Sequence, residues 1–474
     1  MVMGELEQET EVLVIGAGPG GYAAAFRAAD LGKEVTLVDI GTRPGGVCLF
    51  RGCIPSKTFL FLSELLTDAR RAADMGIAFT EPAVDIGKMR SWKQRVVDRL
   101  ADGLVGLTNK RGIQFLKGRA EFTDGRRVQL HDNDISRLRF RHAVIATGSH
   151  PISIPGHPFR KGGRVMNSTQ ALELPDIPAT LLVVGGGYVG LELGSFYAAL
   201  GTEVTVVELG ERLLPMVDAD LVRPLHRRLR DTLAQMVFNT RVTAMNEDDD
   251  GVDVTLENAS GEKIRRFDRV LVAIGRKPNT SGLGLETTGV TLTPEGFIQV
   301  DPRQRTTAEH IYAVGDVTGG VMLAHKGTRE GKIAAEVIAG EPSAFDVRAM
   351  PAVVYTDPQI AWCGLTEQEA GTAGRPVEVH RFPWTASGRA VTMGAAEGVT
   401  KIIADPETRR ILGVGITGRN TEGLISEGVL AIEMGALVED VALTVHPHPT
   451  LSETEGEAAE IFMGSATHIL SGKS

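Results

Sequence analysis

Gly16-Ala17-Gly18-Pro19-Gly20-Gly21 follows the apolar run at residues 12–15, and this stretch decides the fold. A glycine loop directly after a strand serves three purposes: a tight turn at Gly16, a close backbone approach to a pyrophosphate at Gly18, and close packing of helix against strand at Gly21. The N-terminus of the following helix then faces the phosphate charge. The stretch predicts the first turn of a dinucleotide-binding domain, although one glycine loop alone is weak evidence.

The same pattern occurs a second time, which indicates one diverged internal duplication. Residues 181–184 lead into Gly185-Gly186-Gly187-Tyr188-Val189-Gly190. In both copies the next strand-like run ends in an acid, at Asp39 and at Glu208. Such an acid hydrogen-bonds a ribose 2′-hydroxyl and repels a 2′-phosphate, so Glu208 favours NAD over NADP. The repeated spacing argues against chance glycine clusters and against two unrelated surface carboxylates.

The rest of the chain is organised around these two copies. Each copy closes with an apolar run that ends in glycine, at Thr147-Gly148 and at Gly275. Beyond about residue 350, strand-like runs at 399–404 and 411–416 precede a helix-like stretch, which indicates a separate domain. We therefore expect the α/β class, with two Rossmann-like nucleotide-binding domains and an α+β C-terminal domain.

Composition narrows the possible partners and the location. The formal net charge of −10 gives the surface no overall attraction for nucleic acids or anionic membranes. Residues 1–10 contain three glutamates and no basic residue, so they lack the positive region of a secretory signal. The apolar stretch at 181–200 is interrupted by Glu192 and by glycines, unlike a membrane span. We expect a cytoplasmic protein without nucleic-acid or membrane partners.

Two of the three cysteines lie close together, in Gly45-Gly-Val-Cys48-Leu-Phe-Arg-Gly-Cys53-Ile-Pro-Ser-Lys57. Metal sites favour a two-residue spacing with further ligands nearby, so we expect no metal here. A redox pair across one helical turn fits better than two buried structural thiols. Pro55 and the helix-like run after it place Cys53 near a helix start, where the helix dipole favours a thiolate. We expect Cys363 to be structural.

Near the other end, Val445-His446-Pro-His448-Pro-Thr-Leu-Ser-Glu453 places two imidazoles and a carboxylate in one short segment. Thiol exchange needs a base near neutral pH, and a histidine oriented by a carboxylate supplies one. The segment predicts an acid–base dyad. The alternative is a proline-rich loop with exposed histidines.

Together these motifs resemble the pyridine nucleotide disulfide oxidoreductase family across nearly the whole chain. Within that family they are similar to the dihydrolipoyl dehydrogenases of bacterial 2-oxoacid dehydrogenase complexes. The resemblance rests on six motifs in order: the loop at Gly16, Cys48-x4-Cys53-Ile-Pro-Ser-Lys57, Gly185 to Gly190 with Glu192, Gly315-Asp316, Leu323-Ala324-His325-Lys326, and His448-Pro-Thr-Leu-Ser-Glu453.

The resemblance implies a division of the chain and of its cofactors. It implies an FAD-binding domain at 1–150, an NAD-binding domain at 151–279, a return segment at 280–349 that completes the FAD domain, and a C-terminal dimerisation domain at 350–474. It assigns to FAD the residues Gly16, Gly18, Gly21, Asp39, Lys57, Thr147, Gly148, Asp316, Leu323 and Ala324. It assigns to NAD the residues Gly185, Gly187, Gly190, Glu208 and Gly275.

The resemblance also implies a reaction. Cys53 would lie against the flavin and Cys48 would meet the substrate, while Lys57 and Glu192 pair beside the flavin. His448, oriented by Glu453, would deprotonate a dihydrolipoyl thiol. The chain would form a homodimer, in which His448 and Glu453 serve the partner's cysteines. The partners would be lipoyl domains of a 2-oxoacid dehydrogenase complex, or another lipoyl carrier protein.

Two departures and two alternatives remain. Phe50-Arg51 stands where the commonest family pattern has Asn-Val, which puts the surroundings of the disulfide in doubt, and Pro447 stands where alanine is frequent. Another disulfide reductase of the family is opposed by Glu208 and by the absence of a C-terminal cysteine pair. A flavoprotein docking subunit would not need the cysteine pair or the His448–Glu453 dyad. The sequence fixes neither the lipoyl partner nor the direction of flux.

Overall fold

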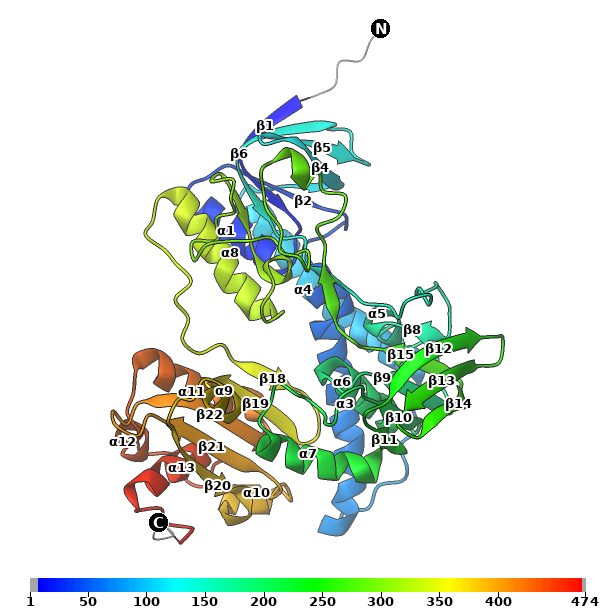
Figure 1. Ribbon diagram of the computed structural model, residues 1–474, viewed down its shortest axis with the longest axis vertical. Coiled ribbons are helices and arrows are strands. Elements are labelled where there is room, and N and C mark those ends of the chain that lie inside the picture. The colour runs from blue at the N-terminus through cyan, green and yellow to red at the C-terminus, as the bar shows by residue number, and fades with distance from the viewer. Residues whose placement is uncertain (1–6, 471–474) are drawn as a thin grey trace. The chain divides into compact units, whose positions relative to one another are not determined.

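The computed structural model describes residues 7–470 (Figure 1). The sequence analysis expects residues 1–10 to lack a secretory signal, and residues 1–6 of that stretch lie outside the described range. The described chain divides into two compact units, of which the first contains the residues up to Thr58, Asp85–Ile152 and Gly275–Asp346. The second contains Phe59–Val84, Ser153–Ile274 and the chain from Val347 onward.

A seven-stranded sheet carries the first glycine loop in the first unit. Its strands are β1 (Glu7–Ile15), β2 (Val35–Asp39), β3 (Gln114–Lys117), β4 (Arg119–Asp124), β5 (Arg127–His131), β6 (Arg137–Ile145) and β17 (Ile311–Ala313). The order is β3-β2-β1-β6-β5-β4, and β17 pairs with β6. Pairs among β1, β2, β3, β6 and β17 are parallel, while β4, β5 and β6 pair antiparallel. The end of β1 is buried, as expected for a central parallel strand.

A parallel sheet carries the second glycine loop in the second unit. Its strands are β8 (Val165–Met166), β9 (Thr180–Val184), β10 (Glu203–Val207), β11 (Gln235–Val237) and β15 (Arg269–Val272). The order β11-β10-β9-β15 repeats the order β3-β2-β1-β6 of the first unit. An antiparallel sheet of β12 (Arg241–Glu247), β13 (Val252–Asn258) and β14 (Gly261–Phe267) intervenes before β15, as β4 and β5 intervene before β6. The duplication is therefore present in the topology.

An antiparallel five-stranded sheet forms the C-terminal part of the second unit. Its order is β18-β19-β22-β21-β20, with bounds β18 (Ala352–Val354), β19 (Gln359–Gly364), β20 (Glu378–Pro383), β21 (Val399–Ala404) and β22 (Ile411–Gly418). Helices α11 (Thr421–Met434), α12 (Val438–Ala442) and α13 (Glu453–Met463) follow it in the chain. Apolar residues of this sheet and of the helices, including Val414, Ile425 and Ala458, share one core. The α/β class with two Rossmann-like domains and an α+β C-terminal domain is confirmed.

Helices α1 (Pro19–Asp30) and α8 (Ala324–Ala339) lie side by side in the first unit (Figure 1). Their contact is so close that a Cβ on Gly331 would lie 2.2 Å from Gly20 O. The remaining α-helices are α2 (Gly46–Arg51), α3 (Cys53–Arg71), α4 (Ile86–Lys110), α5 (Ser168–Ala171), α6 (Tyr188–Ala199), α7 (Ala219–Thr232), α9 (Glu367–Thr372) and α10 (Gly388–Thr392). Strands β7 (Ser149–Pro151) and β16 (Arg276–Pro278) form a two-stranded sheet. Within residues 7–470, none of the helices has the length and apolarity needed to cross a membrane.

Candidate active site

The first glycine loop leaves open space only at its middle glycine. A Cβ on Gly16 would lie 2.3 Å from Ala146 O, and a Cβ on Gly21 would lie 1.8 Å from Gly16 O. A Cβ on Gly18 would have one neighbouring atom within 4 Å, Gly46 Cα at 3.9 Å. Gly18 is also the N-cap of α1 and provides no side-chain cap. The backbone donors at the start of this helix are thus accessible to a phosphate.

The second loop repeats this geometry. A Cβ on Gly185 would lie 2.5 Å from Ala273 O, and one on Gly190 would lie 2.3 Å from Gly185 O. Gly187 has no atom within 4 Å of an added Cβ, and it is the N-cap of α6 without a side-chain cap. Both loops therefore fit the pyrophosphate of a dinucleotide, with the second glycine as the point of approach.

The strand-end acids are bound to their own loops. Asp39 Oδ2 accepts a hydrogen bond from Ala17 N at 2.6 Å, and its Oδ1 accepts one from Gly41 N at 2.7 Å. Glu208 Oε2 accepts one from Gly186 N at 2.6 Å. Because a carboxylate has about four acceptor positions, each acid retains capacity for a ribose hydroxyl.

Asp316 lies in the turn after β17 and is held by residues that the sequence analysis did not assign. Ser149 Oγ donates to Asp316 Oδ2 at 2.5 Å. Arg276 Nε donates to Ser149 Oγ, and its Nη2 donates to Ser149 O, both at 2.7 Å. No local pattern predicts the contact of Ser149 with Arg276, because these residues of β7 and β16 are more than a hundred positions apart.

Two further contacts fix the same region of the first unit. Gly315 N donates to Glu330 Oε2 at 2.7 Å, and Lys326 Nζ lies 2.7 Å from Glu330 Oε1. Burial raises the pKa of Glu330, although the Lys326 ammonium opposes that rise. Leu323 is the N-cap of α8 and Ala324 begins it, so both predicted flavin residues lie at a helix N-terminus.

Thr147 and Gly148 follow β6 and are bound by Asn279, which comes directly after β16. Thr147 Oγ1 donates to Asn279 O at 2.7 Å, and Asn279 Nδ2 donates to Thr147 O at 2.8 Å. Asn279 N donates to Gly148 O at 2.9 Å. Gly275 begins the last segment of the first unit, and its N–Cα torsion φ of +128° favours glycine.

The two cysteines lie on consecutive helices. Cys48 belongs to α2 and Cys53 begins α3, so the expectation that one helical turn joins them is wrong. Gly52 breaks the helix between them, with φ −141° and ψ −106°. The expectation that Cys53 lies near a helix start is confirmed, because Cys53 is the first residue of α3.

Both sulfurs are free thiols, with Cys48 partly buried and Cys53 exposed. A hydrogen bond to Cys53 and burial raise the pKa of Cys48. The raised pKa keeps the proton on Cys48, and the N-terminus of α3 is a position at which the helix dipole stabilises negative charge. Cys363 is buried in the C-terminal core, and burial raises its pKa to about 12.

His448 and Glu453 form the expected pair. His448 Nδ1 donates to Glu453 Oε1 at 2.8 Å, while Thr450 N donates to Glu453 Oε2 at 2.6 Å. Burial alone would raise the pKa of Glu453, but the hydrogen bonds from Thr450 and His448 lower it. The His448 side chain is 71% exposed. An ionised carboxylate thus orients an accessible imidazole.

Glu192 and Lys57 lie in different units, and their pairing stays a prediction. Glu192 is on α6 and only 3% exposed. Its Oε1 accepts a hydrogen bond from Tyr355 N at 3.0 Å. Lys57 lies in the first turns of α3, four residues after Cys53.

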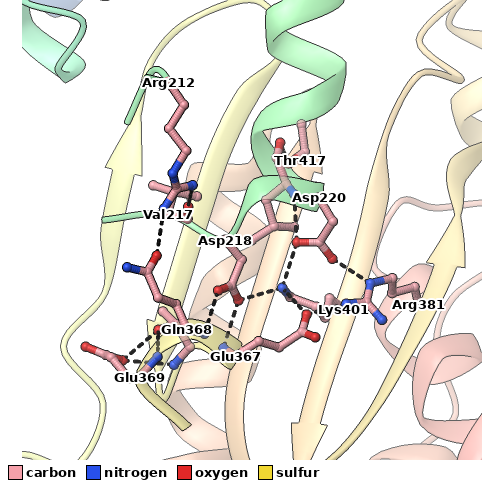
Figure 2. Close-up of polar contacts among 12 residues, drawn as sticks. Arg212, Val217, Asp218, Asp220, Glu367, Gln368, Glu369, Arg381, Lys401 and Thr417 are labelled. Carbon is pink, nitrogen blue, oxygen red and sulfur yellow. Dashed lines mark hydrogen bonds and ion pairs between the residues drawn. The ribbon is translucent and has the colours of Figure 1, made fainter. Parts of the chain in front are cut away.

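A cluster of acids in the second unit surrounds a lysine (Figure 2). Lys401 Nζ lies 2.6 Å from Asp218, 2.9 Å from Asp220 and 2.8 Å from Glu367. The three carboxylates are close enough to ligate a cation, but the Lys401 ammonium already provides the positive charge among them. Arg381 bonds Asp220 and Glu367 as well.

Comparison with family models identifies the chain. Residues 10–331 match the model described as pyridine nucleotide-disulphide oxidoreductase, and residues 350–459 match the dimerisation domain of the same family. The chain belongs to the pyridine nucleotide-disulphide oxidoreductase family.

Relatives within this family are similar over nearly their full length. Dihydrolipoyl dehydrogenase of Vibrio parahaemolyticus is 44% identical over 98% of both chains. Dihydrolipoyl dehydrogenase of Halobacterium salinarum is 43% identical over 99% of this chain and 100% of its own.

Solved structures of the family agree in fold. The crystal structure of LpdA from Mycobacterium tuberculosis has a TM-score of 0.89 and 29% identity, covering 96% of this chain and 100% of that one. The HOCl-induced flavoprotein disulfide reductase RclA from Escherichia coli has a TM-score of 0.84 and 27% identity, covering 95% of this chain and 99% of that one.

Proposed function

We propose that this oxidoreductase is a dihydrolipoyl dehydrogenase, which oxidises protein-bound dihydrolipoyl groups and reduces NAD. The observation that carries the proposal is the thiol pair of Cys48 and Cys53 at the start of α3, in the unit that holds the first glycine loop. The relatives called dihydrolipoyl dehydrogenase, at 43–44% identity over the whole chain, support the same reaction.

FAD and NAD are the cofactors of this family, and the two glycine loops fit them. We propose that FAD is bound through the residues of the first unit that the resemblance assigned, and NAD through Gly185, Gly187, Gly190, Glu208 and Gly275. The corresponding organisation is an FAD domain at 1–150, an NAD domain at 151–279, a return segment at 280–349 and a C-terminal domain at 350–474. The chain crosses between the compact units at residues 58–59, 84–85, 152–153, 274–275 and 346–347, and the last three crossings, which lie near the proposed boundaries, support this organisation.

The proposed mechanism begins with a proton transfer. His448, oriented by Glu453, takes the proton of a dihydrolipoyl thiol, and the resulting thiolate attacks Cys48 Sγ in the oxidised cysteine pair. The Cys48–Cys53 bond breaks and Cys53 leaves as a thiolate, which the α3 N-terminus stabilises. The second lipoyl sulfur then displaces Cys48 and closes the lipoyl disulfide. Bound FAD and NAD supply the chemistry that carries the two electrons away from the cysteines.

We further propose that the working enzyme is a homodimer, in which His448 and Glu453 serve the partner subunit's Cys48. The C-terminal domain matches the family's dimerisation domain. It also exposes large apolar side chains on α11 and in the loop between α12 and α13: Leu430 at 63%, Met434 at 77%, Leu443 at 80% and Val445 at 94%. Such a surface is typical of a protein interface. Lipoyl domains of a 2-oxoacid dehydrogenase complex, or another lipoyl carrier, are the proposed partners, and a cytoplasmic location stays a prediction from the sequence.

The experiment that tests the proposal is steady-state turnover of the purified, FAD-loaded protein with dihydrolipoamide and either NAD or NADP. We expect rapid formation of NADH and little NADPH. We expect His448→Gln to lower kcat by roughly 10²- to 10⁴-fold, as for loss of a general base. Activity with another disulfide and none with dihydrolipoamide would assign the chain to a different reductase, while inactivity with every disulfide would favour a docking role.

A further inference from the structure

The second histidine of the C-terminal segment, His446, has surroundings opposite to those of His448. The His446 side chain is only 9% exposed, and its Nε2 donates to Glu427 Oε1 on α11 at 2.8 Å. The hydrogen bond to Glu427 raises the pKa of His446, although burial opposes that rise. The two residues thus form a second histidine–glutamate pair, which ties the loop between α12 and α13 to α11.

A glycine of α13 leaves room for this imidazole. A Cβ on Gly456 would lie 2.8 Å from His446 Nδ1 and 3.0 Å from its Cε1. Real Cβ atoms do not approach that closely, so His446 occupies a place that a side chain at position 456 would fill. His446 is therefore held between α11 and α13, the helix that Glu453 begins.

The other end of the loop is anchored by buried hydroxyl groups. Trp384 Nε1 donates to Thr400 Oγ1 at 2.9 Å, Thr400 Oγ1 donates to Thr454 Oγ1 at 2.8 Å, and Thr454 Oγ1 donates to Leu451 O at 2.7 Å. The three donor side chains are fully buried. Because the Leu451 carbonyl only accepts, Thr454 donates its single hydroxyl proton there, so Thr400 must be the donor to Thr454. This hydrogen-bonded chain holds Leu451 and Thr454, on either side of Glu453, through uncharged groups.

We propose that His446, through its hydrogen bond to Glu427, is a positioning residue for the His448–Glu453 dyad. The inference deepens the proposed function and rests on it. Among residues 7–470, the exposed His448 imidazole has one hydrogen-bond partner, Glu453, so its position depends on how the loop backbone is fixed at both ends. The Thr454 chain fixes one end and the His446–Glu427 pair fixes the other. A shift of about 1 Å in a catalytic group costs roughly a hundredfold in rate.

The test compares His446→Leu, His446→Gln, Glu427→Leu and the double variant with leucine at both positions. We expect both single leucine variants to lower kcat for dihydrolipoamide oxidation by roughly tenfold to a hundredfold. The double variant should be no slower than the slower single variant, because one contact is lost in each. His446→Gln keeps a donor in place of Nε2 and should recover most of kcat. NADH oxidation by an artificial electron acceptor, which does not need the dyad, should stay unchanged.

His380→Leu is the matched control, because it breaks another histidine–glutamate pair of the same domain, to Glu378 at 2.9 Å. Hydrogen–deuterium exchange of residues 446–453 supplies a readout without turnover, and it should rise in His446→Leu and not in His380→Leu. Unchanged exchange, additive losses in the double variant, or a parallel fall in NADH oxidation would overturn the positioning role. A wild-type protein without lipoamide turnover would instead refute the proposed function, while the exchange result would still decide the positioning role.

Discussion

Asp39 and Glu208 each accept the same two backbone hydrogen bonds, one of which comes from the glycine loop of the same copy. Each carboxylate accepts one from the residue after the first loop glycine, Ala17 N and Gly186 N, at 2.6 Å in both copies. Each also accepts one at 2.7 Å from the glycine two residues after the acid. The acids therefore shape the loops before any ribose is bound, and the duplication extends to individual hydrogen bonds.

We expect Glu208→Ala to reduce the preference for NAD. The substitution removes an acceptor for the ribose hydroxyl and the negative charge that repels a 2′-phosphate. A hydrogen bond to a charged group contributes about 1.5–3 kcal/mol, so the ratio of kcat/KM for NAD to that for NADP should fall roughly tenfold or more. Asp39→Ala is the comparison variant and should weaken retention of FAD instead. An unchanged cofactor ratio would rule out the ribose role of Glu208.

We expect Cys48→Ser to retain bound FAD and to lose dihydrolipoamide oxidation. The hydroxyl cannot form the mixed disulfide with the lipoyl sulfur, so kcat should fall by at least roughly 10³-fold. Flavin absorbance and NADH-dependent dye reduction measure the intact cofactor sites. Cys363→Ala, which changes the buried cysteine outside the pair, is the control and should oxidise dihydrolipoamide at the wild-type rate. Lipoamide oxidation by Cys48→Ser would contradict the redox assignment.

The sequence predicted the parts of the site that local spacing determines. Glycine loops, strand-end acids and the helix start at Cys53 follow from patterns within about thirty residues of each other, because turn and helix preferences act locally. The helix break at Gly52 was missed, since a glycine between two helix-forming stretches does not reveal its backbone torsions. The contact of Asp316 with Ser149 was missed because the two residues are 167 positions apart. The contact of His446 with Glu427, 19 positions apart, was missed because it depends on how the loop after α12 packs against α11.

We expect Lys401→Met to destabilise the second unit. Lys401 is 1% exposed, and its removal leaves the 6% exposed Asp218 without its cation. Within the part of the chain that the structure describes, the hydrogen-bond donors left to the Asp218 carboxylate would be Glu367 N and Gln368 N. Breaking a buried ion pair by removing one partner costs about 3–5 kcal/mol. Thermal or denaturant unfolding of the FAD-loaded protein measures the loss, with exposed Lys263→Met as the control. Equal stability of the two variants would argue against a structural role of the cluster.

The buried carboxyl group of Glu455 predicts a pH dependence of stability. Glu455 is 2% exposed, and among the described residues no hydrogen bond reaches its Oε1. Burial, together with the nearby charge of Glu427, raises the pKa of Glu455 well above 4.5. The folded state therefore binds this proton more tightly than the unfolded state does. Stability falls as the pH rises from the ordinary pKa through the raised one, and the full cost is present above it.

We therefore expect Glu455→Gln to stabilise the protein increasingly as the pH rises above 4.5. The amide stays neutral at every pH, so the variant avoids the cost of ionising a buried acid, about 1.4 kcal/mol for each unit by which the pKa is raised. The measurement is the difference in melting temperature between variant and wild type across a series of pH values. Glu422→Gln, an exposed change on α11, should show no such trend. A difference for Glu455→Gln that does not vary with pH would show that the carboxyl group is not protonated in the folded state.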